Sequence, residues 1–237
     1  MIWEPLVLPP LRAEGNNFIT DIRRGMQCIP EELQEKFAAA GHKLIIARNL
    51  ADASDLLPVT RAYLKETQNI DICEGLKAFN KNKGAFFQYD NHIVIPQSAS
   101  GTVSDHIWGI TPQYIAAHEI GHLFDCTSIP DSFLSAEQDF IQIAAPELQA
   151  VKKMRQLLLT PNGANIINAI ADEKPFVALQ EVFADLFADT MLEQNTMRRF
   201  FPESAAWIAD KIDEQAANIR GSLTPAESSP SPIAAVA

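Results

Sequence analysis

The stretch AAHEIGHLFD, residues 116–125, constrains the fold of this chain more than any other. It carries two of the five histidines, His118 and His122, four residues apart with Glu119 between them. Its flanks are apolar, which predicts a buried helix that begins with Thr111 as N-cap and Pro112 in the first turn. Histidines buried without partners carry a desolvation cost. The helix is therefore expected to hold either hydrogen-bonded core histidines or a metal ion.

The spacing favours a metal. On a helix, His118 and His122 share one face, so both imidazoles can reach one tetrahedral ion. Glu119 then lies beside the ligands, where it can touch a metal-bound water without ligating the metal. Gly121 is unusual inside a helix and predicts a close approach by something else, of which another helix is the simplest case.

A second segment carries the candidate for a third ligand. Residues 179–189, LQEVFADLFAD, form a strongly apolar predicted helix with Glu181, Asp185 and Asp189 on one stripe. One explanation is a solvated face. The other makes Glu181 the third ligand and Asp185 an acceptor for the free N–H of a ligand histidine, with Asp189 facing solvent.

Two residues that follow His122, Asp125 and Cys126, could also take part in the predicted metal site. Asp125 stays on the ligand face, so it could support a ligand or tie down the following loop. Cys126 could compete with Glu181 as a ligand, although a single cysteine there is more often a small buried apolar residue.

Composition limits the class of protein. Of 237 residues, 47% are hydrophobic and 21% charged, which is typical of a globular protein. A formal net charge of −11 argues against nucleic acid or an anionic membrane as the main partner. Three widely spaced cysteines predict no disulfide framework, and no secretory signal or membrane span is predicted. The expected location is the cytoplasm, or outside the cell by a route without a classical signal, as a possible effector.

The pattern along the chain predicts an α+β fold that is mainly helical, with a small N-terminal sheet. Residues 1–29 are expected to be irregular, with a helix following from Pro30 to Gly41 and a buried strand at Lys43–Ala47. AFFQY and HIVIP around Asp90-Asn91 predict a hairpin, with His92–Pro96 at the sheet edge because it ends in proline. Further helices are predicted in part at 52–67, at 136–144 with Ser135 as cap, and from Pro146 to about Leu159. Two more are predicted from Pro175 to about Gln194 and from Pro202 to near Gly221. We expect a single domain at 1–221 and a disordered Ser/Pro/Ala-rich tail at 222–237.

HEIGHLFD followed by QEVFADLFAD resembles the gluzincin metallopeptidases, in which HExxH pairs with a glutamate of a downstream ExxxD helix. The segments AFFQYDNHIVIP, SFLSAEQDF and FPESAAW extend the similarity to the group of the anthrax lethal factor catalytic domain, the Pro-Pro endopeptidases and the Mlc titration factor peptidases. The resemblance covers about residues 30–215. It implies a zincin-like fold whose edge strand flanks the active-site cleft, with one Zn²⁺ held by His118, His122 and Glu181 and with Glu119 as general base.

The chain departs from that group at one position. The group commonly has a tyrosine seven residues before the glutamate ligand, where this chain has Lys174. Tyr114, His106 or Lys174 itself could stabilise the oxyanion instead.

Two functions are therefore expected. The first is a zinc endopeptidase whose polypeptide substrate binds as an extended strand along His92–Pro96. The second is a zinc-binding regulatory or binding protein that retains the site with little or no turnover, as the missing tyrosine would favour. A helical scaffold without metal is the remaining alternative.

Overall fold

Two short strands, β2 (Lys43–Ala47) and β4 (His92–Pro96), form the centre of the sheet and are buried on both faces. Alternate residues of a strand point to opposite faces. Leu44, Ile46, Ile93 and Ile95 accordingly join one hydrophobic cluster, and Ile45, Ala47 and Val94 join another. The sheet therefore separates two layers of helix. The computed structural model describes residues 3–11, 15–78, 85–97, 111–129, 132–151, 154, 163–172 and 174–223.

The strand order is β1-β2-β4-β3, where β1 is Leu6–Val7 and β3 is Ala85–Phe87. β1 and β4 pair parallel with β2, and β3 pairs antiparallel with β4 through the predicted hairpin, whose residue Asn91 has φ 50°. β4 is thus interior, and its prediction as an edge strand is wrong. Pro96 is tolerated because its position lies beyond the last β3 pair, Ala85 with Val94. Among the described strands, β3 and β1 are the edges.

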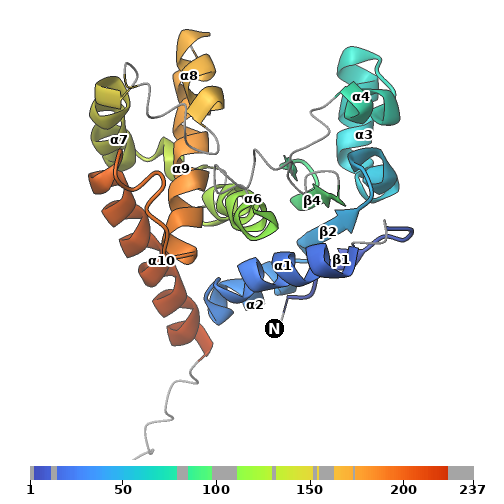
Figure 1. Cartoon of the computed structure of the whole chain (residues 1–237), viewed down its shortest axis with the longest axis horizontal. Helices are drawn as coiled ribbons and strands as arrows, with labels where there is room; N and C mark the ends of the chain where they lie inside the picture. The colour runs from blue at the N-terminus through green and yellow to red at the C-terminus, as the bar shows by residue number, and fades with distance from the viewer. Residues whose placement is uncertain are drawn as a thin grey trace, which may run out of the picture.

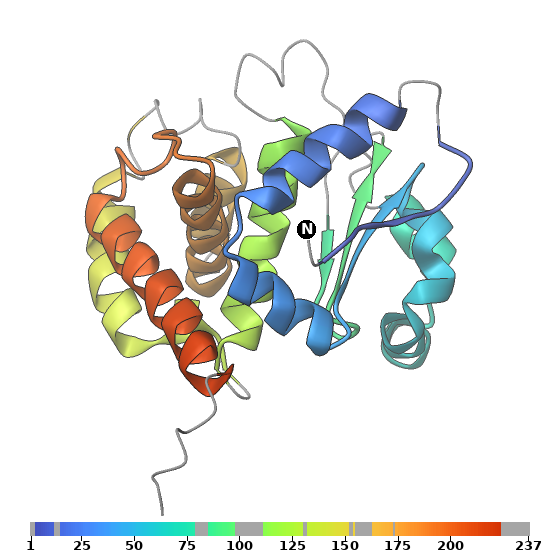
Figure 2. The same ribbon diagram turned by 90° about the horizontal axis from the view of Figure 1, so that it is seen from below.

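Helices cover both faces of the sheet, and the C-terminal helices lie farther from it, beyond α6. In Figures 1 and 2, α1 and α2 lie on one side of the strands and α3 and α4 on the other, and α6 lies between the sheet and the C-terminal helices. The helices are α1 (Gly15–Gln27), α2 (Glu31–Ala39), α3 (Pro58–Gln68), α4 (Ile72–Ala78), α6 (Pro112–Thr127), α7 (Gln138–Val151), α8 (Gly163–Ala171), α9 (Pro175–Met191) and α10 (Pro202–Leu223), with 3-10 turns η1 (Leu50–Leu56) and η3 (Leu134–Ala136). The predicted α+β class, mainly helical with a small N-terminal sheet, is confirmed. Among the described residues, no helix is both long and apolar enough to cross a bilayer.

Two further predicted elements differ from the structure. The prediction that residues 1–29 are irregular is wrong for Gly15–Gln27, which form α1, because Phe18, Ile22 and Met26 recur at helical spacing and bury one face of the helix. Pro146 does not restart a helix but lies inside α7. Proline removes one backbone hydrogen bond, and the buried residues Phe140, Ala144, Leu148 and Val151 on either side of it keep the helix packed.

The last helix is slightly longer than predicted. α10 ends at Leu223, two residues past the predicted Gly221. The predicted disordered tail therefore falls, from residue 224 onward, outside the described residues.

Candidate metal centre

α6 begins as the sequence predicts. The Thr111 side chain accepts a hydrogen bond from the Tyr114 backbone N–H at 3.1 Å, and Pro112 occupies the first turn. This cap starts the helix at a point that places His118 and His122 on one face, with their ring centroids 4.8 Å apart at 89°. Both rings are partly exposed, at 13% and 18% of their side chains.

Gly121 allows α9 to approach α6 closely. A methyl group at Gly121 would lie 2.9 Å from Cα of Ala184 and 3.1 Å from Cβ of Phe187, both on α9. Ordinary contacts begin at 3.4 Å, so a side chain here would push the helices apart. The close approach expected at this glycine is therefore helix packing, and it brings Glu181 of α9 alongside the two histidines of α6.

His118, His122 and Glu181 form a group that could hold a metal ion, since their ligand atoms all lie within 4.8 Å of one another. Nε2 of His118 is 3.7 Å from Oε2 of Glu181, and Nε2 of His122 is 3.9 Å from Oε1. Ligands at zinc bond lengths around a tetrahedron lie roughly 3.4 Å apart. Small side-chain movements would therefore bring the three groups onto one ion.

Asp185 contacts the His118 ring at Nδ1, the nitrogen that faces away from Glu181. Its Oδ1 lies 2.7 Å from Nδ1 of His118 and accepts a hydrogen bond from the Tyr114 hydroxyl at 2.9 Å. A carboxylate accepts only, so Nδ1 carries a proton and Nε2 is the ring nitrogen left for a metal on the Glu181 side. Asp185 is fully buried, and Tyr114 is 3% exposed.

Charge and burial shift the pKa values of the two imidazoles in opposite directions. Burial lowers the pKa of His118, but the charge and hydrogen bond of Asp185, with Glu119 and Glu181, raise that pKa to about 9. Burial and the neighbouring His118 lower the pKa of His122 to about 4. His122 therefore offers a neutral ring nitrogen at neutral pH, and His118 would release a proton on taking a metal.

Glu119 lies between the two histidines on α6 and is 6% exposed. Its charge raises the pKa of His118, which indicates that its carboxylate lies near the ligand group.

Asp125 is hydrogen-bonded to the segment that follows α6. Its Oδ1 accepts from the Ser135 backbone N–H at 2.6 Å and its Oδ2 from the Ser135 hydroxyl at 2.7 Å. Of the two alternatives for Asp125, the structure shows the one that ties down the following segment. Ser135, expected as an N-cap, lies instead in η3, and α7 begins at Gln138.

Asp189 does not face solvent, as the sequence led us to expect. It is fully buried, and its Oδ2 accepts backbone N–H groups of Met197 at 2.6 Å and Arg198 at 3.1 Å. Carboxylates of an acidic stripe on a core helix are thus used for buried hydrogen bonds rather than for solvation.

The three oxyanion candidates have different surroundings. The Tyr114 hydroxyl is committed to Asp185 at the Nδ1 side of His118, away from the ligand nitrogen. Nζ of Lys174 lies 3.6 Å from Asp172 and its side chain is 62% exposed. His106 lies outside the described residues.

Cys126 does not belong to the ligand group among the described residues. Its Sγ donates to the Leu123 carbonyl at 3.5 Å. Burial and the charge of Asp125 raise the pKa of its thiol to about 12, so it stays protonated and is a poor metal ligand.

The sequence interpretation missed the pairing of Tyr114 with Asp185. The signal was present: Tyr114 is one turn before His118 on α6, and Asp185 is one turn after Glu181 on α9. Two such stripes on facing helices meet when the helices pack.

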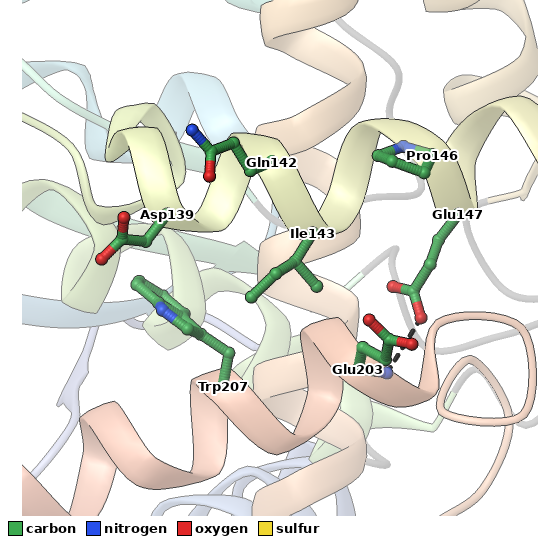
Figure 3. A pocket seen from close by; sticks show the side chains of 7 residues that line it. All are labelled: Asp139, Gln142, Ile143, Pro146, Glu147, Glu203 and Trp207. Atoms are coloured by element: carbon green, nitrogen blue, oxygen red, sulfur yellow. Dashed lines mark hydrogen bonds between the residues drawn. The ribbon is translucent and has the colours of Figure 1, made fainter.

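A hollow of about 460 Å³ lies between α7 and α10 (Figure 3), and His118, His122 and Glu181 are not among its lining residues. Glu147 in its wall accepts the backbone N–H groups of Glu203 at 2.9 Å and Ser204 at 3.2 Å, as the dashed line to Glu203 shows (Figure 3). Glu147 thereby caps the first turn of α10. Its role is structural.

No family model matches the chain, and no curated protein matches it.

Proposed function

We propose that this chain is a zinc-dependent endopeptidase with a zincin-like fold. The proposal rests on one observation: ligand atoms of His118, His122 and Glu181 all lie within 4.8 Å of one another. The buried Asp185 also holds the His118 ring through Nδ1. Two histidines and a glutamate are a typical catalytic zinc set. The three side chains are 13%, 18% and 23% exposed, so none of them is fully enclosed by the protein.

The donor chemistry fits zinc. His122 is neutral at neutral pH, and the Nδ1 proton of His118 is held by Asp185, so both Nε2 atoms can ligate. A bound zinc ion would polarise the scissile carbonyl and lower the pKa of a bound water.

The chain's own residues supply proton transfer and orientation. In the proposed reaction, the Glu119 carboxylate takes a proton from the attacking water and delivers a proton to the leaving amine. Asp185 and Tyr114 hold the His118 ring. An extended substrate would pair with β3, the edge strand on the α6 side of the sheet, since β4 is interior.

One observation favours the second candidate, a zinc-binding protein with little turnover. Of the oxyanion candidates in the described residues, Tyr114 donates to Asp185 and Lys174 pairs with Asp172. Neither contact points such a group at the open side of the ligand set.

The test is a metal analysis combined with cleavage of unfolded casein, read by mass spectrometry. We expect one zinc per chain and specific cleavage. Glu119→Gln should keep zinc and lose at least about 100-fold in activity, the scale of a lost general base. Glu181→Gln should lose both. Glu66→Gln, an exposed carboxylate on α3, is the matched control and should change neither. Zinc without cleavage of any peptide would refute the endopeptidase and leave the binding protein.

A further inference from the structure

The first turn of α9 is exposed, and the turns after it are buried. Phe176 and Val177 are 38% and 41% exposed, whereas each residue from Val182 to Asp189 is buried. Large apolar side chains this exposed are few among the described residues. Two adjacent ones at the start of an otherwise core-like helix need a partner or a function.

Val177 lies beside the metal-ligand group. It is one turn before Glu181, so the two side chains share a face of α9. Helical side chains lean toward the helix N-terminus, which brings the Glu181 carboxylate over the turn that carries Val177. A molecule bound at Glu181 would therefore have Val177 one helical turn away on the same face of α9.

A second element completes the apolar surface. The ring of Phe133 packs edge-on against Phe176, with centroids 5.6 Å apart at 74°. Phe133 immediately precedes η3, and Ser135 of η3 is anchored to Asp125 by two hydrogen bonds. The chain thus uses a buried carboxylate on the metal-ligand helix α6 to position an aromatic ring next to the ligand helix α9.

We infer that Phe133, Phe176 and Val177, here called the apolar patch, bind an apolar side chain of the peptide substrate next to the scissile bond. The inference rests on the proposed function and specifies its substrate class as polypeptides with a large apolar residue at that position. The patch adjoins the ligand set through the Val177–Glu181 turn. It is apolar within a chain of formal net charge −11, so an acidic side chain would be disfavoured there.

The binding test uses zinc-loaded, full-length Glu119→Gln protein, in which bound peptides persist. The probes are fluorescein-labelled random hexapeptide pools with one central residue held as Leu, Phe or Asp, measured by fluorescence anisotropy. We expect the Leu and Phe pools to bind roughly tenfold more tightly than the Asp pool. Val177→Asp should abolish that preference, and the nearly isosteric Val177→Thr should reduce it.

Val59→Asp is the matched control. Val59 is also a valine in the first turn of a proline-initiated helix, α3, and is 50% exposed. It should leave the peptide preference unchanged. Asp is favourable in a first helical turn, so both Asp variants should fold, and circular dichroism checks this.

The cleavage test uses wild-type protein on unfolded casein. We expect an apolar residue to be enriched beside the cut, and Val177→Asp to raise KM for those sites with kcat little changed. Cleavage without apolar enrichment would refute the proposed role of the apolar patch, and so would the same enrichment in Val177→Asp. Either result would still be consistent with an endopeptidase. Apolar preference in binding without any cleavage supports the patch and refutes the endopeptidase. A wild-type dimer that Val177→Asp converts to monomer in sedimentation assigns the patch to self-association and overturns the inference.

Discussion

Gly121→Ala should destabilise the protein, although alanine is the better helix former. The added Cβ would lie 2.9 Å from Cα of Ala184, where ordinary contact begins at 3.4 Å, so α6 and α9 must separate by about 0.5 Å. The obstructing atoms are backbone and cannot rotate away. Overpacking of this kind costs about 1–3 kcal/mol, and alanine recovers about 1 kcal/mol of helix propensity. We expect a net loss of up to about 2 kcal/mol in the free energy of unfolding.

Gly221→Ala is the matched control for this change. Gly221 lies in α10, and a Cβ there meets nothing within 4 Å. That variant should gain up to about 1 kcal/mol. Urea unfolding of the metal-free proteins measures both. If Gly121→Ala proves as stable as Gly221→Ala, the close approach of α6 and α9 is wrong.

The same substitution should weaken the metal centre. Separation of α6 and α9 carries Glu181 away from the histidines, so the zinc affinity, measured by competition with a chelator, should fall about tenfold or more. Gly25→Ala separates this effect from stability. A Cβ at Gly25 would lie 2.6 Å from the Gln113 carbonyl oxygen, at the contact of α1 with α6 rather than α9. It should destabilise the fold while changing zinc affinity much less. Equal loss of affinity in both variants would refute the geometric explanation.

Three further predictions concern buried polar groups. Tyr114→Phe should lower zinc affinity about tenfold in chelator competition, because Asp185 loses the donor that helps it hold His118; unchanged affinity would make the contact incidental. Asp125→Asn should remove a pH dependence of stability. Burial raises the pKa of Asp125 from 3.8 to about 6, so its contribution is fully present below pH 3.8 and is lost as pH rises through 6. Wild-type stability relative to Asp125→Asn should thus fall by about 3 kcal/mol between pH 4 and 7 in urea titrations, and a difference that rises would contradict the buried carboxylate. Asp189→Ala should cost about 2–4 kcal/mol in the free energy of unfolding, because the N–H groups of Met197 and Arg198 lose their acceptor; a cost under 1 kcal/mol would argue that water replaces it.

The amino-acid sequence by itself determined the local parts of this protein. Residues within one or two helical turns determine three features: the cap at Thr111, the shared face of His118 and His122, and the acidic stripe that begins at Glu181. The hairpin at Asp90-Asn91 depends on turn residues that tolerate positive φ. Such features depend on neighbours a few residues away, so a single sequence displays them.

Only the tertiary structure decided what these parts face. β4 became interior because β2, far earlier in the chain, pairs with it in parallel, and a hairpin pattern carries no information about that second neighbour. Asp189 is buried because the segment at Met197 folds back onto α9, and Asp125 binds Ser135 rather than a histidine. Tyr114 meets Asp185 only because Gly121 lets two helices pack closely. These outcomes depend on long-range packing, which residue spacing within one segment does not encode.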